Sequence, residues 1–110
     1  MSAITGYHAH VHFDAESREQ ARELCEAAVN TFGRPVGRMH DNPVGPHLRG
    51  SCQLVFGPEL FGQVISWLIE HRKGLTIFAH ANTGDDLKDH TDHVIWLGPS
   101  ETLNLAALSK

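Results

Sequence analysis

Alternating apolar and polar residues near the start of the chain predict a β-strand. Residues 7–13 read YHAHVHF, with apolar side chains at the odd positions and histidines at His8, His10 and His12. Side chains two residues apart on a strand share a face, so the apolar row and the histidine row point in opposite directions. The pattern therefore predicts one face that packs into a core and one that carries a functional site.

Further along the chain, apolar residues recur at helical spacing in two segments, residues 14–33 and 57–74, and predict a helix in each. Gly33 and Gly74 are suited to end these helices. The remaining patterns predict strands at residues 36–40, 51–56 and 75–80, an irregular loop rich in proline and glycine at 41–50, and a last short strand at 93–98 before a C-terminal segment with a helical turn.

This order of elements predicts an α+β fold of the ferredoxin-like βαββαβ type, with a C-terminal extra strand and helical segment. A length of 110 residues suits a single domain spanning residues 1–110. In this plan both helices cover one face of an antiparallel sheet, and the histidines lie on the other. We expect a second copy to cover that open face, with Trp67, Phe78 and Trp96 available for contact, and hence a homodimer.

The strand at 75–80 brings a further histidine to the same place. In the predicted sheet it pairs antiparallel with the first strand, so that His80 becomes a neighbour of His8 or His10. Its alternation also places Phe78 and His80 on the open face. Imidazoles on adjacent strands are close enough for their nitrogens to share a first-row metal at about 2.0–2.1 Å. Such a site suits iron(II) that binds oxygen or zinc that activates water, and the residues alone leave both open.

The composition excludes some classes of binding partner. A net charge of −4 gives no basic stripe for nucleic acid, and nine histidines are the unusual feature. Apolar runs fall short of the roughly 20 residues of a membrane span, and the N-terminus has no secretory pattern, so we expect a cytoplasmic protein without a membrane partner. Cys25 and Cys52 lack the CxxC spacing of a zinc or redox motif and are interpreted as buried apolar residues.

The remaining polar residues are weaker candidates. His47 and His90 fall in predicted loops, where histidines are common, and His40, His71 and His93 are interpreted as surface or structural residues. The acidic run at 85–92 is interpreted as a solvated turn, although a carboxylate in it could orient a metal-binding imidazole.

Four separated motifs resemble the DOPA 4,5-dioxygenase family over roughly residues 7–108: YHAHVHFDAESREQA, PVGPH, GLTIFAHANTGDDLKDHTDHVIWLG and LNLAAL. The resemblance implies a ferredoxin-like dimer that opens a catechol ring such as that of L-DOPA, using molecular oxygen at non-haem iron. Its partners would be a small aromatic substrate and oxygen. Iron(II) is the implied cofactor, with zinc or another divalent metal as a substitute in purified protein.

The family's histidine motifs fall on His8, His10, His47, His80 and His90. From the resemblance we expect His8, His10 and His80 to hold the metal, with His47 as another possible third ligand. His47 and His90 would then act as the catalytic acid and base, for which imidazole is suited near neutral pH.

We expect His12 and Phe78 to contact the substrate, since both lie on the predicted histidine face. Two other functions remain open: a metal-binding dimer that is a zinc-dependent hydrolase or a small-molecule binding protein, and a dimerisation module whose histidines fill a polar interface.

Overall fold

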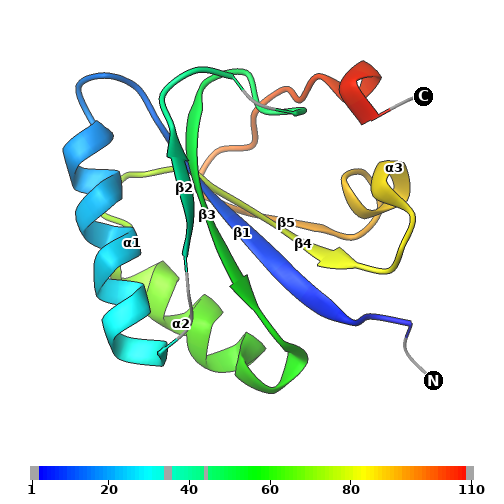
Figure 1. The fold of residues 1–110 in the computed structure, drawn as a ribbon, viewed down its shortest axis with the longest axis horizontal. Coiled ribbons are helices and arrows are strands. Elements are labelled where there is room, and N and C mark those ends of the chain that lie inside the picture. Colours follow the sequence, from blue (N-terminus) through cyan, green and yellow to red (C-terminus); the bar gives the residue numbers. More distant parts are fainter. Residues whose placement is uncertain (1–2, 34–35, 44, 109–110) are drawn as a thin grey trace.

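The computed structural model describes residues 3–33, 36–43 and 45–108, which form an antiparallel sheet with two long helices on one side (Figure 1). The strand order is β2-β3-β1-β4-β5, and every neighbouring pair is antiparallel. The strands are β1 (Gly6–Phe13), β2 (Val36–His40), β3 (Gly50–Phe56), β4 (Ile77–Asn82) and β5 (Val94–Leu97). The predicted order of elements is confirmed, and the extra strand β5 lengthens the sheet beside β4.

Both long helices lie where the sequence predicts them. Helix α1 (Arg18–Phe32) ends at Gly33, whose positive φ of 67° lets its N–H donate to the carbonyl of Val29. Helix α2 (Phe61–His71) follows the short 3-10 helix η1 (Pro58–Leu60).

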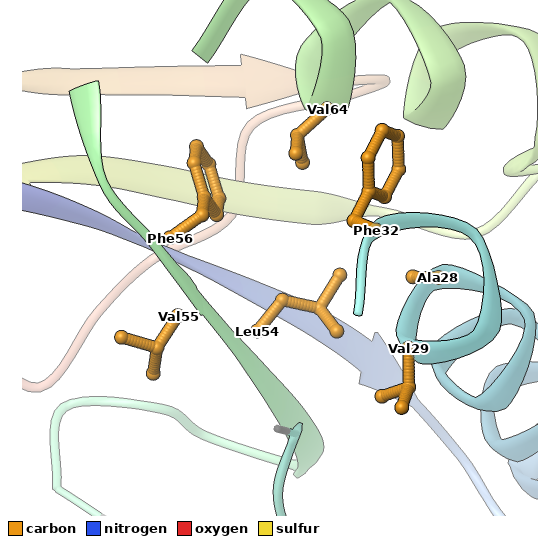
Figure 2. A pocket seen from close by; sticks show the side chains of 7 residues that line it. All are labelled: Ala28, Val29, Phe32, Leu54, Val55, Phe56 and Val64. Carbon is orange, nitrogen blue, oxygen red and sulfur yellow. The ribbon is translucent and has the colours of Figure 1, made fainter. Parts of the chain in front are cut away.

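The apolar row of β1 packs beneath these helices. Ala9 and Val11 are fully buried in one core with Leu68 of α2 and Ile77 of β4. The alternation predicted for β1 and β4 is therefore confirmed. A small apolar cavity of about 20 Å³ lies in this layer between α1, β3 and α2, and Figure 2 shows the side chains that line it. It is about large enough for one water molecule, so it holds no substrate.

The tryptophans correct one detail. Trp67 was expected on the open sheet face, but it lies on α2, where its ring is 5.9 Å from that of Phe32 and stacks on His71. It precedes Leu68 in α2 and packs at the edge of the same helical stripe. Trp96 does lie on the histidine face, against Phe78.

The face opposite the helices is less open than predicted, because the chain covers much of it. The helix α3 (Asp86–Asp89), the 3-10 helix η2 (Leu105–Leu108) and the loop before β3 lie on this side (Figure 1). The N–H of Asn104 donates to the carbonyl of Pro46 at 2.7 Å, which joins the C-terminal segment to that loop. As a result, His10 is only 6% exposed without any second subunit. Among the described residues, no helix is long and apolar enough to cross a membrane.

Candidate functional site

Three histidines from the two central strands converge on one point. His8 of β1 is paired directly with His80 of β4, and Nε2 of His10 lies 3.2 Å from Nε2 of His80. Ring nitrogens of all three lie within 4.8 Å of one another. Two nitrogens bound to one metal at 2.0–2.1 Å are about 3–3.5 Å apart. The His10–His80 pair already has this separation, so the donor set fits a divalent metal.

Two more histidines flank this cluster from the covering segments. The ring of His47 lies 4.2 Å from that of His10, and the ring of His90 lies 4.1 Å from that of His80. The structure thus brings together the five histidines of the sequence motifs. A pocket of about 210 Å³ lies among them, lined by His8, His10, His40, Gly45, Pro46, His47, Ser51, Gln53, His80 and His90. His40, which was interpreted as a surface or structural residue, also lines it.

The two residues expected to contact substrate lie behind this lining. Phe78 is fully buried, with its ring 6.0 Å from that of His10 and 4.7 Å from that of Trp96. His12 is 1% exposed, and both of its ring nitrogens have partners within the protein. In these positions Phe78 and His12 are better placed to support the wall of the pocket than to contact a substrate.

Backbone carbonyls fix the tautomers of two pocket histidines. Nδ1 of His80 lies 3.1 Å from the carbonyl oxygen of Ala81, and Nδ1 of His90 lies 2.7 Å from that of Asp86. A carbonyl only accepts, so each Nδ1 carries the proton and donates it. When neutral, each of these rings has its lone pair on Nε2, the nitrogen available to a metal or a proton.

Burial keeps the cluster uncharged. It lowers the pKa of His10 well below its usual value, and the neighbouring His47 and His80 lower it further. Burial, followed by nearby histidines, lowers the pKa of His47 to about 3. The pKa of His80 falls to about 4 by burial, although its hydrogen bond to Ala81 opposes the shift. Neutral imidazole is the form that binds metals, so these residues are ready for one at neutral pH.

Residues 7–107 match the Dopa 4,5-dioxygenase family. The chain belongs to this family. It is 34% identical to a DOPA 4,5-dioxygenase of Amanita muscaria, in an alignment that covers 97% of this chain and 51% of the fungal protein. An uncharacterised 21.2 kDa protein of Botryotinia fuckeliana is 32% identical, with 99% of this chain and 67% of that protein covered. The chain therefore spans about half the length of the Amanita enzyme.

A solved structure is also similar. A crystallised protein of Nostoc punctiforme, described as a candidate dioxygenase, is 42% identical and superposes with a TM-score of 0.93. The match covers 96% of this chain and 92% of that one.

In this member of the Dopa 4,5-dioxygenase family, one acidic residue of the 85–92 run is structural. Asp89 is only 2% exposed, and its carboxylate accepts from the N–H and hydroxyl of Thr83 at 2.7 and 2.6 Å. Nδ1 of His93 donates to it at 2.8 Å. Although burial opposes the shift, the bonds from Thr83 and His93 lower the pKa of Asp89. Asp89 thereby links α3 to the end of β4. It directly precedes His90 in the sequence.

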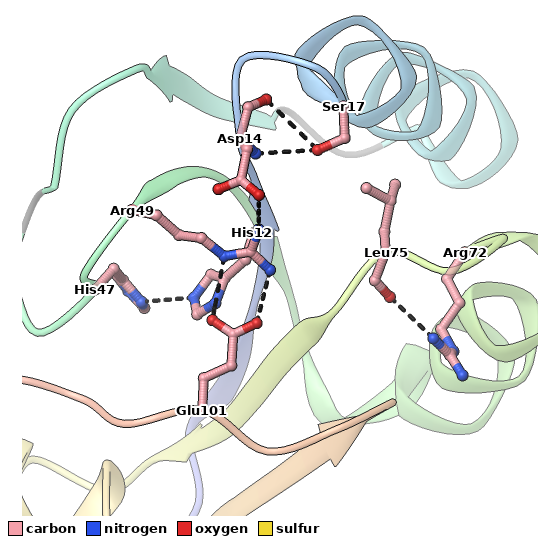
Figure 3. Close-up of polar contacts among 8 residues, drawn as sticks. All are labelled: His12, Asp14, Ser17, His47, Arg49, Arg72, Leu75 and Glu101. Atoms are coloured by element: carbon pink, nitrogen blue, oxygen red, sulfur yellow. Dashed lines mark hydrogen bonds and ion pairs between the residues drawn. The ribbon is translucent and has the colours of Figure 1, made fainter.

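Sequence reasoning missed Glu101. This residue follows β5 in an irregular segment, and its Oε1 lies 3.1 Å from Nδ1 of His12 (Figure 3). Arg49, just before β3, donates to both carboxylate oxygens of Glu101. Residues 98–104 have no periodic pattern, so no signal in the sequence indicates this contact.

Proposed function

We propose that the chain is an extradiol dioxygenase that opens a catechol ring, with a DOPA-like molecule as substrate and iron(II) held by His8, His10 and His80. The observation that carries this proposal is the convergence of three imidazoles, with nitrogens within 4.8 Å of one another, at the base of a pocket. Membership of the Dopa 4,5-dioxygenase family supports the reaction class. The substrate class is inferred from the name of the Amanita relative.

A divalent iron at this position would supply the positive charge that makes a catechol hydroxyl more acidic and the redox chemistry that activates oxygen. The protein's own contribution is to orient and exchange protons. His47 and His90 lie on either side of the cluster, 4.2 and 4.1 Å from the rings of His10 and His80. In the proposal they take protons from the catechol hydroxyls and return one as the ring opens. Zinc or another divalent metal could occupy the same donors in purified protein.

The size of the pocket supports a small substrate. Its volume of about 210 Å³ is below the roughly 300–1,000 Å³ of sites for drug-sized ligands. Ser51 and Gln53 of β3 add hydrogen-bonding groups to the lining, on the other side of β1 from His80 of β4. A single aromatic ring with polar substituents matches this combination of size and polarity.

The proposal includes the wider architecture. The βαββαβ unit from β1 to β4 would be a ferredoxin-like domain within a single domain of residues 1–110, working as a cytoplasmic homodimer. Exposed Leu48, Leu87 and Leu105, on the segments that cover the histidine face, are the apolar side chains available for a dimer contact. Light scattering at micromolar concentration tests this directly, and a monomer would contradict the dimer.

Anaerobic loading with iron(II) followed by oxygen and L-DOPA tests the reaction. We expect oxygen uptake that requires the catechol, with one oxygen consumed per yellow ring-opened product, and none with tyrosine, which has a single ring hydroxyl. A chain that binds metal without oxygen uptake would be the hydrolase or binding protein considered above. A chain that binds no metal would favour the dimerisation module.

A further inference from the structure

A chain of polar contacts runs from the C-terminal segment through β1 to the pocket. Oε1 of Glu101 lies 3.1 Å from Nδ1 of His12, and Nε2 of His12 lies 3.0 Å from Nδ1 of His47 (Figure 3). Glu101 and His12 are 89 positions apart in the sequence. Of the three, only His47 lines the pocket.

The Glu101 carboxylate is held as a hydrogen-bond acceptor. Nη2 of Arg49 donates to Oε2 of Glu101 at 2.6 Å, and Nε of Arg49 donates to Oε1 at 3.2 Å. Nη1 of Arg49 also pairs with Oδ2 of Asp14 at 3.0 Å. Burial alone would raise the pKa of Glu101, but the hydrogen bonds from Arg49 and His12 lower it below its usual value. At neutral pH Glu101 is therefore ionised, and an ionised carboxylate only accepts.

The acceptor at Glu101 determines where the protons of the next two rings lie. Because Glu101 only accepts, Nδ1 of His12 must carry a proton. A neutral imidazole carries one ring proton, and the contact with Glu101 holds that proton of His12 on Nδ1, so Nε2 is its unprotonated nitrogen. That bare nitrogen accepts from Nδ1 of His47. Neutral His47 then has its lone pair on Nε2, and its ring lines the pocket.

The same tautomer occurs at His80 and His90, where backbone carbonyls accept from Nδ1. At His47 the partner of Nδ1 is Nε2 of His12, a side chain that is itself oriented by Glu101. We infer that Glu101, held by Arg49, acts through His12 to fix His47, a residue that lines the pocket, in the tautomer whose unprotonated nitrogen is Nε2. Glu101 and His12 are thus positioning residues, an inference that rests on the proposed function in so far as His47 accepts a proton from the substrate.

An isosteric substitution at Glu101 should move the ring protons of His12 and His47 to the other nitrogen of each ring. In Glu101→Gln, the 2.6 Å contact with Nη2 of Arg49 outweighs the longer 3.2 Å contact with its Nε, which keeps the oxygen at the Oε2 position and turns the amide NH₂ towards Nδ1 of His12. His12 then donates from Nε2, and the proton of His47 moves from Nδ1 to Nε2. Asp14→Asn is the matched control, since it removes the other carboxylate partner of Arg49 without touching His12.

Two-bond ¹H–¹⁵N correlations of the histidine side chains in metal-free protein at neutral pH measure the tautomers directly. We expect His12 and His47 to be protonated on Nδ1 in the native protein and in Asp14→Asn, and on Nε2 in Glu101→Gln. A native His47 protonated on Nε2 would overturn the inference without any variant. So would a His47 tautomer that is unchanged in a folded Glu101→Gln protein, or one that changes equally in Asp14→Asn.

Turnover separates this inference from the proposed function. In iron(II)-loaded protein with L-DOPA, Glu101→Gln should lower kcat about a hundredfold, the contribution typical of one general base, while Asp14→Asn stays near native. If the tautomer of His47 changes and kcat does not, Glu101 does fix this tautomer through His12, and the role of His47 as proton acceptor is wrong. If the tautomer of His47 does not change, the inference that Glu101 fixes it is wrong, whatever the activity.

Discussion

The two faces of the sheet are both buried, but by different means. On one face Ala9 and Val11 pack against Leu68 and Ile77, in a layer with a small apolar cavity of about 20 Å³. On the other face the histidine row lies under short irregular segments and surrounds a pocket of about 210 Å³. The helices fill their face with apolar contacts, whereas the covering segments leave room and supply polar groups.

This difference separates stability from chemistry. The helix face contributes through apolar area and close packing, so its residues affect the free energy of unfolding. The histidine face contains buried groups that remain stable only when neutral or hydrogen-bonded. Changes on the first face should therefore alter stability, and changes on the second should alter metal binding, proton positions and acid sensitivity.

The largest stability effect is expected in the helix-face core. Ile77→Ala removes a fully buried side chain and should lower the free energy of unfolding by about 2–5 kcal/mol in urea denaturation. Iron(II) stoichiometry in the folded protein should stay native. Ile69→Ala, at a side chain that is 57% exposed, is the control and should change stability by less than about 0.5 kcal/mol. Equal effects of the two substitutions would contradict the assigned core.

A smaller effect is expected from Asp89→Asn, at the attachment of α3 to β4. The amide cannot accept all three hydrogen bonds from Thr83 and His93, so the change should cost about 1–3 kcal/mol. Amide hydrogen exchange should also become faster at Thr83 and His90. Asp92→Asn, at an exposed position of the same run, is the matched control. Unchanged exchange at His90 in Asp89→Asn would show that Asp89 does not anchor the helix.

The two faces should also differ in their response to acid. His47 and His80 have folded-state pKa values of about 3 and about 4, below the ordinary 6.5 of the unfolded chain. Above pH 6.5 both states are neutral, and below it the unfolded state binds protons that the native state does not. The free energy of unfolding should therefore fall as the pH is lowered from 6.5, by up to about 1.4 kcal/mol per pH unit for each group.

Urea denaturation of metal-free protein between pH 6.5 and pH 5 measures this slope. His80→Ala should reduce this slope by about the contribution of one histidine. His71→Ala, at an exposed position of α2, should leave the slope unchanged. A stability that is constant or rises as the pH falls through this range would contradict a buried, neutral histidine cluster.

The helix face could be predicted because its periodicity is local. Alternation in residues 7–13 and 75–80 is enough to place Val11 and Ile77 on one side and His10 and His80 on the other, as the register shows. The same argument brought His8 and His80 together. Trp67 was misplaced because it was assigned by its aromatic character, whereas its position beside Leu68 in α2 decides where it lies.

The covering of the histidine face could not be predicted in this way. Glu101 meets His12 across 89 positions, from a segment that has no period and no regular structure. Asp89 lies in an acidic run whose average character is that of a solvated turn, and it is buried only because α3 folds back onto β4. Such contacts depend on the path of loops in three dimensions, which short-range patterns do not encode.

The most direct test of the account is the metal content of the histidine cluster. Native protein loaded anaerobically with iron(II) and freed of excess metal should hold one iron per chain by metal analysis, because His8, His10 and His80 supply its donors. His10→Ala and His80→Ala should each lose that iron while staying folded by circular dichroism, and His71→Ala should keep it. If His10→Ala retained stoichiometric iron, the histidine row of β1 would not be the metal platform, and the central claim would be wrong.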